Sequence, residues 1–381
     1  MKKDGPLRIA MTINGYYPRI GGAERILGDI APLLQKQDIE VHILTRRYPG
    51  LTPFELVDGV SVHRLPIPDP KAVASLSFTL TALLKLRGLQ PDIIHAHEMF
   101  SATTTAIAAK NLWGTPVVVT VHRSGNLGEV HRLRQKIFGE RRLTTFGKKV
   151  DTFISISHEI DSELAEIGVP SERRHFIPNA VDVERFTPLP LAEKRALRTA
   201  LGLPDAPIVI FTGRLAPEKR VNHLITIWPA VRTIHPGALL IILGTGEEEA
   251  SLKQMAGEGV KFAGRIDDVA PYLQASDLFV LPSIAEGLSV ALLEAMSTGL
   301  AAVVTEVGGA PDIINHNTNG WLLPPDNVPA LQEAITTLLG DTDRRLSFGQ
   351  CGREEIVRNY SLPVIVTRLR GLYDQIMANK G

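Results

Sequence analysis

The sequence predicts an α/β protein built from two doubly wound parallel-sheet domains. Short runs of β-branched and aliphatic residues alternate with helical patterns along the whole chain. Many of these runs are almost entirely apolar, as expected of parallel strands covered on both faces. The length of 381 residues corresponds to two or three domains at ~150 residues each.

The strand-like runs form two groups. In the first half they cover residues 7–13, 41–45, 61–65, 92–97, 117–122 and 152–157. In the second half they cover residues 208–212, 238–243, 260–263, 278–282, 301–305 and 320–323. Helical patterns such as 24–37, 219–234 and 288–298 lie between them. Repetition of strand, helix and strand builds a parallel sheet in each half.

A proline-rich stretch without periodicity, residues 178–190, separates the halves. We therefore expect an N-terminal Rossmann-like domain over residues 1–180 and a C-terminal one over 191–360. Residues 361–381 are expected to form a helix that crosses back to the N-terminal domain. Ligands of open α/β sheets bind beyond the carboxyl ends of the strands, so the chemistry should lie in loops that follow strands.

Composition excludes several classes of protein. Hydrophobic residues make up 44% and charged residues 22%, which is typical of a globular chain and not of a disordered or fibrous one. Lys plus Arg and Asp plus Glu both number 41, which argues against a nucleic-acid-binding protein. The single cysteine, Cys351, excludes a disulfide framework and a cysteine zinc site. With no secretory or membrane-spanning pattern, we expect a cytoplasmic protein.

One informative segment is residues 283–289, Ser-Ile-Ala-Glu-Gly-Leu-Ser, which follow a predicted strand and open a helix. Free N–H groups at a helix start bind anions, and Gly287 permits close approach. Glu294 lies among apolar residues, where a carboxylate needs donors such as sugar or ribose hydroxyls. The alternative is that Ser283 or Glu286 caps the helix and Glu294 is solvated.

A second segment follows the predicted strand 208–212. Gly213 and Arg214 end this strand, and Lys219 is expected to begin the next helix. Two cations beside a glycine suit a diphosphate, whereas the alternative is a solvated basic turn.

In their order and spacing these segments resemble glycosyltransferase family 4. The resemblance rests on Gly213–Arg214 with Glu218–Lys219, and on Glu286 and Glu294 separated by seven residues. It extends over nearly the whole chain, through residues 21–25, 92–97, 120–122, 177–182, 261–265 and 275–278. It implies the GT-B fold, a nucleotide-sugar donor and retention of the anomeric configuration.

The resemblance also implies a role for each matched residue of the C-terminal domain. Arg214 and Lys219 would hold the donor diphosphate. Glu286 would bind hydroxyls of the transferred sugar, and Glu294 would bind the ribose. Arg265 would lie beside the nucleobase. The backbone that cradles sugar and phosphates would be that of Gly287, Leu288 and Ser289.

In the N-terminal domain, the resemblance gives roles to a glycine pair and a histidine. Gly21 and Gly22 would close on the diphosphate, and His122 would face the sugar. The implied catalytic set is His122, Glu286, Arg214 and Lys219. His95 and His97 share one face of a predicted strand and are interpreted as satisfied histidines outside this set.

The implied activity is a metal-independent hexosyl or glycosyl transfer without a cofactor. UDP-sugars are the first expected donors and GDP-mannose the next. The expected acceptor is a hydroxyl of a saccharide or lipid-linked saccharide of cell-envelope or exopolysaccharide synthesis. Two alternatives stay open. One is another GT-B enzyme, such as a nucleotide-sugar epimerase or an inverting transferase with His122 as general base. The other is an inactive nucleotide-sugar-binding regulatory subunit.

Three residues depart from the family pattern. Arg123 stands where an acid is frequent, and Arg220 and Ala180 stand where glycines are usual. An anionic acceptor group could meet Arg123, but a solvent-facing loop charge is the favoured interpretation.

Three further patterns have structural interpretations. Residues 123–149 hold eight Lys and Arg against Glu129 and Glu140; this surface either rests on an anionic membrane or is a solvated helix whose apolar stripe packs on the sheet. Gly244 and Gly246 lack the third glycine of a dinucleotide fingerprint. The acidic stretch 341–343 is expected to cap a helix and not to hold a metal.

Overall fold

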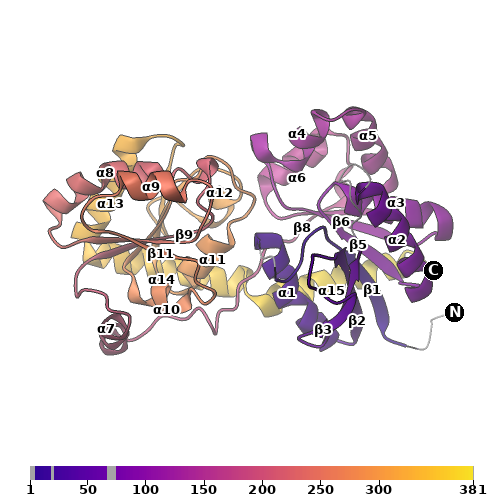
Figure 1. Cartoon of the computed structure of the whole chain (residues 1–381), viewed down its shortest axis with the longest axis horizontal. Coiled ribbons are helices and arrows are strands. Elements are labelled where there is room, and N and C mark those ends of the chain that lie inside the picture. Colours follow the sequence, from indigo (N-terminus) through magenta and orange to yellow (C-terminus); the bar gives the residue numbers. More distant parts are fainter. Residues whose placement is uncertain (1–4, 19–20, 67–73, 381) are drawn as a thin grey trace. The chain divides into compact units, whose positions relative to one another are not determined.

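The computed structural model describes residues 5–18, 21–66 and 74–380, in two compact units (Figure 1). Unit 1 comprises Met1–Asn179 and Leu362–Gly381, and unit 2 comprises Ala180–Ser361. The C-terminal helix therefore belongs to the unit that contains the N-terminus, and it packs against the first helix of that unit.

Unit 1 contains an eight-stranded sheet in the order β3-β4-β2-β1-β5-β6-β7-β8, parallel except for the β3–β4 pair. Its strands are β1 Leu7–Thr12, β2 Ile39–Arg46, β3 Phe54–Val57, β4 Val60–Leu65, β5 Ile93–His97, β6 Val117–Val121, β7 Thr152–Ser155 and β8 Arg174–Phe176. Its helices are α1 Gly22–Gln35, α2 Ala74–Leu89, α3 Ser101–Trp113, α4 Glu129–Arg134, α5 Gly139–Lys149, α6 His158–Glu166 and α15 Leu362–Ala378. Short 3-10 turns are η2 Gly125–Leu127 and η3 Ser171–Arg173.

The central strands of this sheet are apolar because helices cover them. Every residue of β5 and β6 is buried. Helix α1 buries Ile26, Leu27 and Ile30 on one face, which is the spacing of an amphipathic helix. The strand order reverses between β1 and β5, so the loops after these strands diverge at the carboxyl edge of the sheet.

Unit 2 contains a fully parallel six-stranded sheet in the order β11-β10-β9-β12-β13-β14. Its strands are β9 Ile208–Thr212, β10 Leu239–Leu243, β11 Val260–Gly264, β12 Leu278–Leu281, β13 Ala301–Thr305 and β14 Trp321–Leu323. Its helices are α7 Leu191–Ala200, η4 Pro217–Lys219, α8 Val221–Ile234, α9 Glu249–Met255, α10 Ala270–Ala275, α11 Val290–Ser297, α12 Ala310–Ile313, α13 Val328–Gly340 and α14 Thr342–Asn359. Two parallel-sheet α/β units confirm the predicted fold class.

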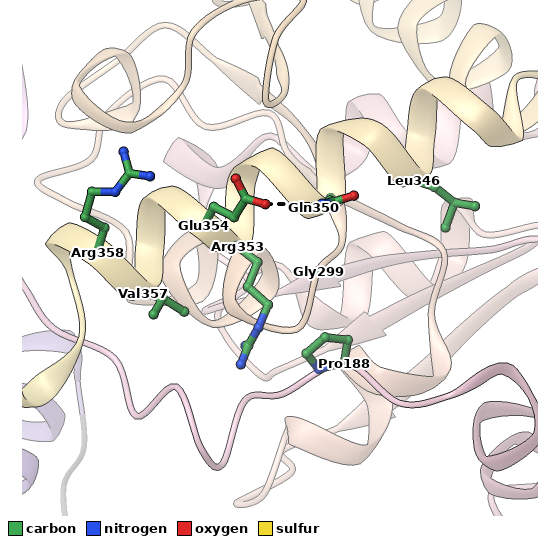
Figure 2. A pocket seen from close by; sticks show the side chains of 9 residues that line it. Pro188, Gly299, Leu346, Gln350, Arg353, Glu354, Val357 and Arg358 are labelled. Carbon is green, nitrogen blue, oxygen red and sulfur yellow. Dashed lines mark hydrogen bonds between the residues drawn. The ribbon is translucent and has the colours of Figure 1, made fainter.

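The segment after residue 180 is tied to unit 2 through α14. Arg353 donates to the carbonyl oxygens of Phe186 (2.9 Å) and Val183 (3.3 Å), and Ser297 Oγ also donates to Phe186 (2.7 Å). In Figure 2 the Arg353 side chain extends from α14 toward the segment that carries Pro188. Arg353 and Pro188 border a groove of about 720 Å³ that none of the predicted site residues lines. The groove is thus separate from the candidate chemistry.

Two predicted helix starts are wrong. Lys219 ends the 3-10 turn η4, and α8 begins at Val221. The helix after residue 283 begins at Val290, and not earlier, because the Ser289 side chain caps it by accepting from the Leu292 N–H (3.3 Å). Neither Ser283 nor Glu286 is therefore the cap.

No helix of the described residues is both long and apolar enough to cross a bilayer.

Candidate active site

The candidate site of unit 2 lies where its strand order reverses. Strands β9 and β12 are neighbours, but β9 continues to β10 on its other side. The loops that follow β9 and β12 therefore leave the sheet at the place where open α/β sheets bind their ligands, which we call the β9–β12 crevice. Arg214 and Lys219 follow β9, and Ser283 and Glu286 follow β12.

Lys219 and Glu286, 67 residues apart in the sequence, meet in this crevice. Lys219 Nζ lies 2.5 Å from Glu286 Oε1, and Ser283 Oγ donates to the same oxygen at 2.7 Å. The side chains of Lys219 and Glu286 are only 17% and 13% exposed. The structure thus brings together an ammonium, a carboxylate and a hydroxyl at low exposure, which is a set able to bind phosphate and sugar hydroxyls. Sequence reasoning did not include Ser283 in the site, although its place directly after a strand is a usable signal.

Backbone hydrogen bonds fix the loops around this cluster. The Ile284 N–H donates to the Glu218 carbonyl (2.8 Å), and the Gly309 N–H donates to the Gly287 carbonyl (2.6 Å). A Cβ at Gly308, whose φ is +59°, would lie 2.4 Å from that Gly287 oxygen. Sequence reasoning did not include Gly308 and Gly309 in the site. The signal that could have found them is a pair of glycines shortly after a predicted strand.

Arg214 occupies the outer part of the crevice. Its side chain is 56% exposed, and it donates to Glu218 at 2.5 Å. Burial alone would raise the pKa of Glu218, but a backbone hydrogen bond and the Arg214 charge outweigh it and hold the pKa below its ordinary value. Arg214 is the exposed member of this pair, whereas the Glu218 side chain is only 15% exposed. A diphosphate can therefore reach Arg214 from solvent and replace Glu218 as its partner.

Arg220 adopts the left-handed conformation, with φ of +51°. This backbone is strained for any residue except glycine, which gives a physical reason for the glycine usual at this position. The Arg220 side chain donates to both carboxylate oxygens of Asp326, at 2.8 and 3.4 Å. Arg220 therefore joins the end of the Lys219 turn to the loop between β14 and α13.

Glu294 is 3% exposed on α11, so the solvated alternative for this carboxylate is wrong. Gly287 and Ser289 are partly exposed and Leu288 is buried just before the helix.

Arg265 follows β11, is exposed, and has Asp267 as its ion-pair partner (3.3 Å). The strand β10 separates β11 from β9, so Arg265 stands apart from the Lys219 cluster.

Gly244 and Gly246 serve backbone packing. A Cβ on Gly244 would lie 1.8 Å from the Gly213 carbonyl oxygen, and one on Gly246 would lie 2.1 Å from that of Leu215. These glycines let the Arg214 loop lie directly against the loop after β10.

Asp341 caps α14 by accepting from the Arg344 N–H (2.9 Å), as predicted. Among the described residues there is no group of three His, Cys, Asp or Glu side chains placed to hold a metal.

In unit 1 the predicted glycines open α1. Gly21 is the N-cap, and its N–H donates to Glu24 Oε2 at 2.9 Å. Gly22 is the first residue of the helix, and both glycines are exposed. An exposed helix start with two glycines can approach an anion closely.

His122 directly follows β6 and is held on two sides. Its Nε2 lies 3.1 Å from His97 Nδ1, and its backbone N–H donates to Glu129 Oε1 at 2.7 Å. Glu129 also accepts from the Met99 N–H (2.6 Å), so it joins the ends of β5 and β6. Burial, then the charge of Glu98, raise the pKa of Glu129 above its ordinary value. Burial lowers the pKa of His122 well below 6.5, so this ring is neutral at pH 7. Sequence reasoning missed Glu129, because the two strand ends that it joins come together only in the folded chain.

Two family models match the chain. Residues 20–185 match Glycosyltransferase Family 4, and residues 206–341 match Glycosyl transferases group 1. A GDP-mannose-dependent monoacylated alpha-(1-6)-phosphatidylinositol monomannoside mannosyltransferase of Corynebacterium glutamicum is 27% identical over 377 residues, 95% of this chain and 96% of that protein. A UDP-Gal:alpha-D-GlcNAc-diphosphoundecaprenol alpha-1,3-galactosyltransferase of Escherichia coli is 28% identical over 95% of this chain and 96% of its own.

Solved structures share the fold over the whole chain. Sucrose-phosphate synthase of Thermosynechococcus elongatus has a TM-score of 0.82 at 21% identity, with 98% of this chain and 100% of that one covered. HepE of Anabaena, solved in complex with UDP, has a TM-score of 0.79 at 20% identity, with 97% and 100% covered. The chain therefore belongs to glycosyltransferase family 4 and has the GT-B fold.

Proposed function

We propose that this protein is a retaining glycosyltransferase that moves a sugar from a nucleotide-sugar to a hydroxyl acceptor. The observation that carries the proposal is the contact of Lys219 with Glu286 at the β9–β12 crevice, with Ser283 on the same carboxylate oxygen. A cation for the diphosphate and a carboxylate for the sugar hydroxyls stand side by side there. The donor-binding residues of unit 2 would place Glu294 on the ribose and Arg265 beside the base, and Gly21 and Gly22 of unit 1 would close on the diphosphate.

The chemistry breaks the bond between the anomeric carbon and the β-phosphate oxygen. Negative charge then develops on the diphosphate, and Arg214, Lys219 and the N–H groups that open α11 stabilise it. The acceptor oxygen bonds to the anomeric carbon on the face that the diphosphate leaves, and the departing phosphate takes the acceptor proton. No protein nucleophile and no metal ion are needed, so transfer should persist in EDTA.

The names of the relatives support a nucleotide-sugar donor and a lipid-linked acceptor. One relative uses GDP-mannose and acts on a phosphatidylinositol mannoside, and another uses UDP-galactose and acts on a diphosphoundecaprenol-linked sugar. We favour a UDP-sugar as donor, with GDP-mannose next, and a saccharide or lipid-linked saccharide of the cell envelope as acceptor. The reaction would take place on the cytoplasmic side.

Unit 1 carries a surface suited to an anionic membrane, between α4 and α5 (Figure 1). At this turn Ile137 and Phe138 are 84% and 71% exposed. The surrounding residues 123–149 hold eight Lys and Arg against two acids; Glu129 is buried, and Glu140 pairs with Arg134 at 3.1 Å. Unit 1 as a whole has 26 Lys and Arg against 19 Asp and Glu, whereas unit 2 has 15 against 22. Exposed apolar residues among cations are the composition of a peripheral membrane contact.

Vesicle sedimentation tests this contact. We expect binding to vesicles that contain phosphatidylglycerol and little binding to phosphatidylcholine alone. The double variant Ile137→Ser/Phe138→Ser should lose most of the binding, while Leu346→Ser, at a leucine of unit 2 that is 63% exposed, should not. Equal binding by the double variant would place the contact elsewhere.

A thermal-shift screen tests the donor site. UDP-, GDP- and ADP-sugars are compared, and one of them should raise the melting temperature because it binds only the folded chain. No shift with any nucleotide-sugar would contradict the proposal. A shift without consumption of the donor, in the presence of lipid-linked and free saccharides, would instead favour the regulatory subunit.

A further inference from the structure

Three histidines lie together at the ends of β5 and β6 in unit 1. The His95 and His97 rings stack with centroids 4.5 Å apart, and the His97 and His122 rings stack at 5.3 Å. His97 Nδ1 lies 3.1 Å from His122 Nε2. One of these two nitrogens must carry the hydrogen and the other must accept it.

The remaining nitrogen of His97 decides which one donates. His97 is 7% exposed, and its Nε2 has no hydrogen-bond partner among the described residues. Burial lowers the pKa of His97 to about 4, so the ring carries a single hydrogen at neutral pH. A buried N–H without an acceptor is rarer and costlier than a buried lone pair without a donor. The hydrogen of His97 is therefore on Nδ1.

The hydrogen on His97 Nδ1 fixes the form of His122. Nδ1–H of His97 donates to Nε2 of His122, which must be unprotonated to accept. Since the His122 ring is neutral, its own hydrogen is then on Nδ1. His95 does not take part in this choice, because its Nδ1 is bonded to Tyr373 Oη and its Nε2 to Thr120 Oγ1, both at 2.7 Å.

We propose that His97 is a positioning residue that holds His122 in the Nδ1–H tautomer, so that His122 offers the donor sugar a hydrogen-bond donor and not a basic lone pair. The second half of this statement rests on the proposed function. The only lone pair of the neutral His122 ring is occupied by His97. His122 is therefore unsuited to act as the general base of an inverting transferase.

The tautomer is measured directly by long-range proton–nitrogen NMR on the full chain labelled with ¹⁵N-histidine. The chain has 11 histidines, and the His122→Gln spectrum identifies the His122 signals. We expect the pattern of an Nδ1–H ring with unprotonated Nε2 for His122 between pH 7 and 8. An Nε2–H pattern for His122 in the native protein would overturn the proposal, whatever the activity.

Two variants then separate positioning from general stability. His97→Leu removes the donor, so His122 should change to the Nε2–H tautomer and kcat should fall about tenfold, the loss of one hydrogen bond in the transition state. His97→Asn keeps an N–H near the position of Nδ1 and should retain the native tautomer and most of kcat. Tyr373→Phe is the matched control, since it removes a hydrogen bond from His95 without touching His122.

Nucleotide affinity distinguishes this proposal from a failure of the proposed function. UDP or GDP should bind all three variants equally, because the residues proposed to hold the base and ribose are in unit 2. A changed tautomer with unchanged kcat in His97→Leu would overturn the role of His97 in transfer. Loss of kcat with the native tautomer retained would do the same, whereas absence of nucleotide binding in the native chain would contradict the proposed function instead.

Discussion

Replacing Lys219 by Met removes an ammonium from the crevice and keeps most of the aliphatic stem. Lys219 Nζ lies 2.5 Å from Glu286 Oε1, and the two side chains are 17% and 13% exposed. Breaking a fully buried pair costs about 3–5 kcal/mol, and an exposed pair costs under about 1 kcal/mol. At this intermediate exposure we expect a loss of about 1–3 kcal/mol in the free energy of unfolding. Because the ammonium also stabilises the diphosphate, kcat/KM should fall about a hundredfold or more.

The double variant Lys219→Met/Glu286→Gln separates the two roles of Lys219. The double variant leaves no unpaired carboxylate, so its free energy of unfolding in urea should be close to that of the native protein. Its kcat/KM should nevertheless remain about a hundredfold below that of Glu286→Gln alone, because the diphosphate still lacks its cation. Lys253→Met, on an exposed pair with Glu249, is the surface control and should change stability by less than about 0.5 kcal/mol. If the double variant and Glu286→Gln had equal kcat/KM, Lys219 would serve only to hold Glu286, and the diphosphate assignment would be refuted.

Glu294→Gln should weaken the binding of both free nucleotide and nucleotide-sugar in calorimetry, whereas Glu286→Gln should weaken only the sugar donor; the opposite pattern would exchange their roles. Arg220→Gly relieves the left-handed strain and Arg220→Ala does not, so in urea unfolding the Gly variant should be about 1 kcal/mol more stable than the Ala variant; equal stabilities would contradict the strain argument. The pKa of His97 is about 4 in the folded chain against an ordinary 6.5, so between these pH values the unfolded chain binds more protons and the free energy of unfolding falls as the pH falls. The variant His97→Asn should therefore lose about 3 kcal/mol less than the native protein over this pH range. An unchanged pH dependence of the free energy of unfolding would show that His97 does not titrate in this way. Donor binding should compact the protein by closure of its two units, which small-angle scattering detects as a smaller radius of gyration. Gly22→Val should prevent this decrease while leaving the nucleotide affinity unchanged. An unchanged radius of gyration in the native protein would refute closure.

The parallel strands were predictable because each is a run of apolar residues. Most observed strands begin and end within one or two residues of the prediction. Strands β3 and β8 were missed, since no residue of either is fully buried and neither has an apolar run. Lys219 was predicted as a site residue from its position after a strand, and Glu286 from the family resemblance. Their direct contact required the neighbouring placement of β9 and β12, which a linear pattern does not contain.

Local loop geometry accounts for most of the remaining differences. The turn Pro217–Lys219 and the left-handed Arg220 delay the start of α8 to Val221, although the helical pattern predicted from the sequence begins at residue 219. Glu129 acts on backbone groups of two different strands, and the tautomer of His122 depends on a ring 25 residues away. Such contacts join distant parts of the chain, so spacing and residue type cannot predict them.

The central claim is that this chain transfers sugar from a nucleotide donor with retention. It is tested most directly by following the anomeric proton by NMR when the protein is incubated with an α-linked UDP-sugar or GDP-mannose. Even without an acceptor, slow hydrolysis should release the α-anomer first, before it equilibrates in solution, and Lys219→Met should abolish the release. Initial release of the β-anomer would contradict retention, and intact donor in the presence of both free and lipid-linked saccharide acceptors would contradict the enzymatic function itself.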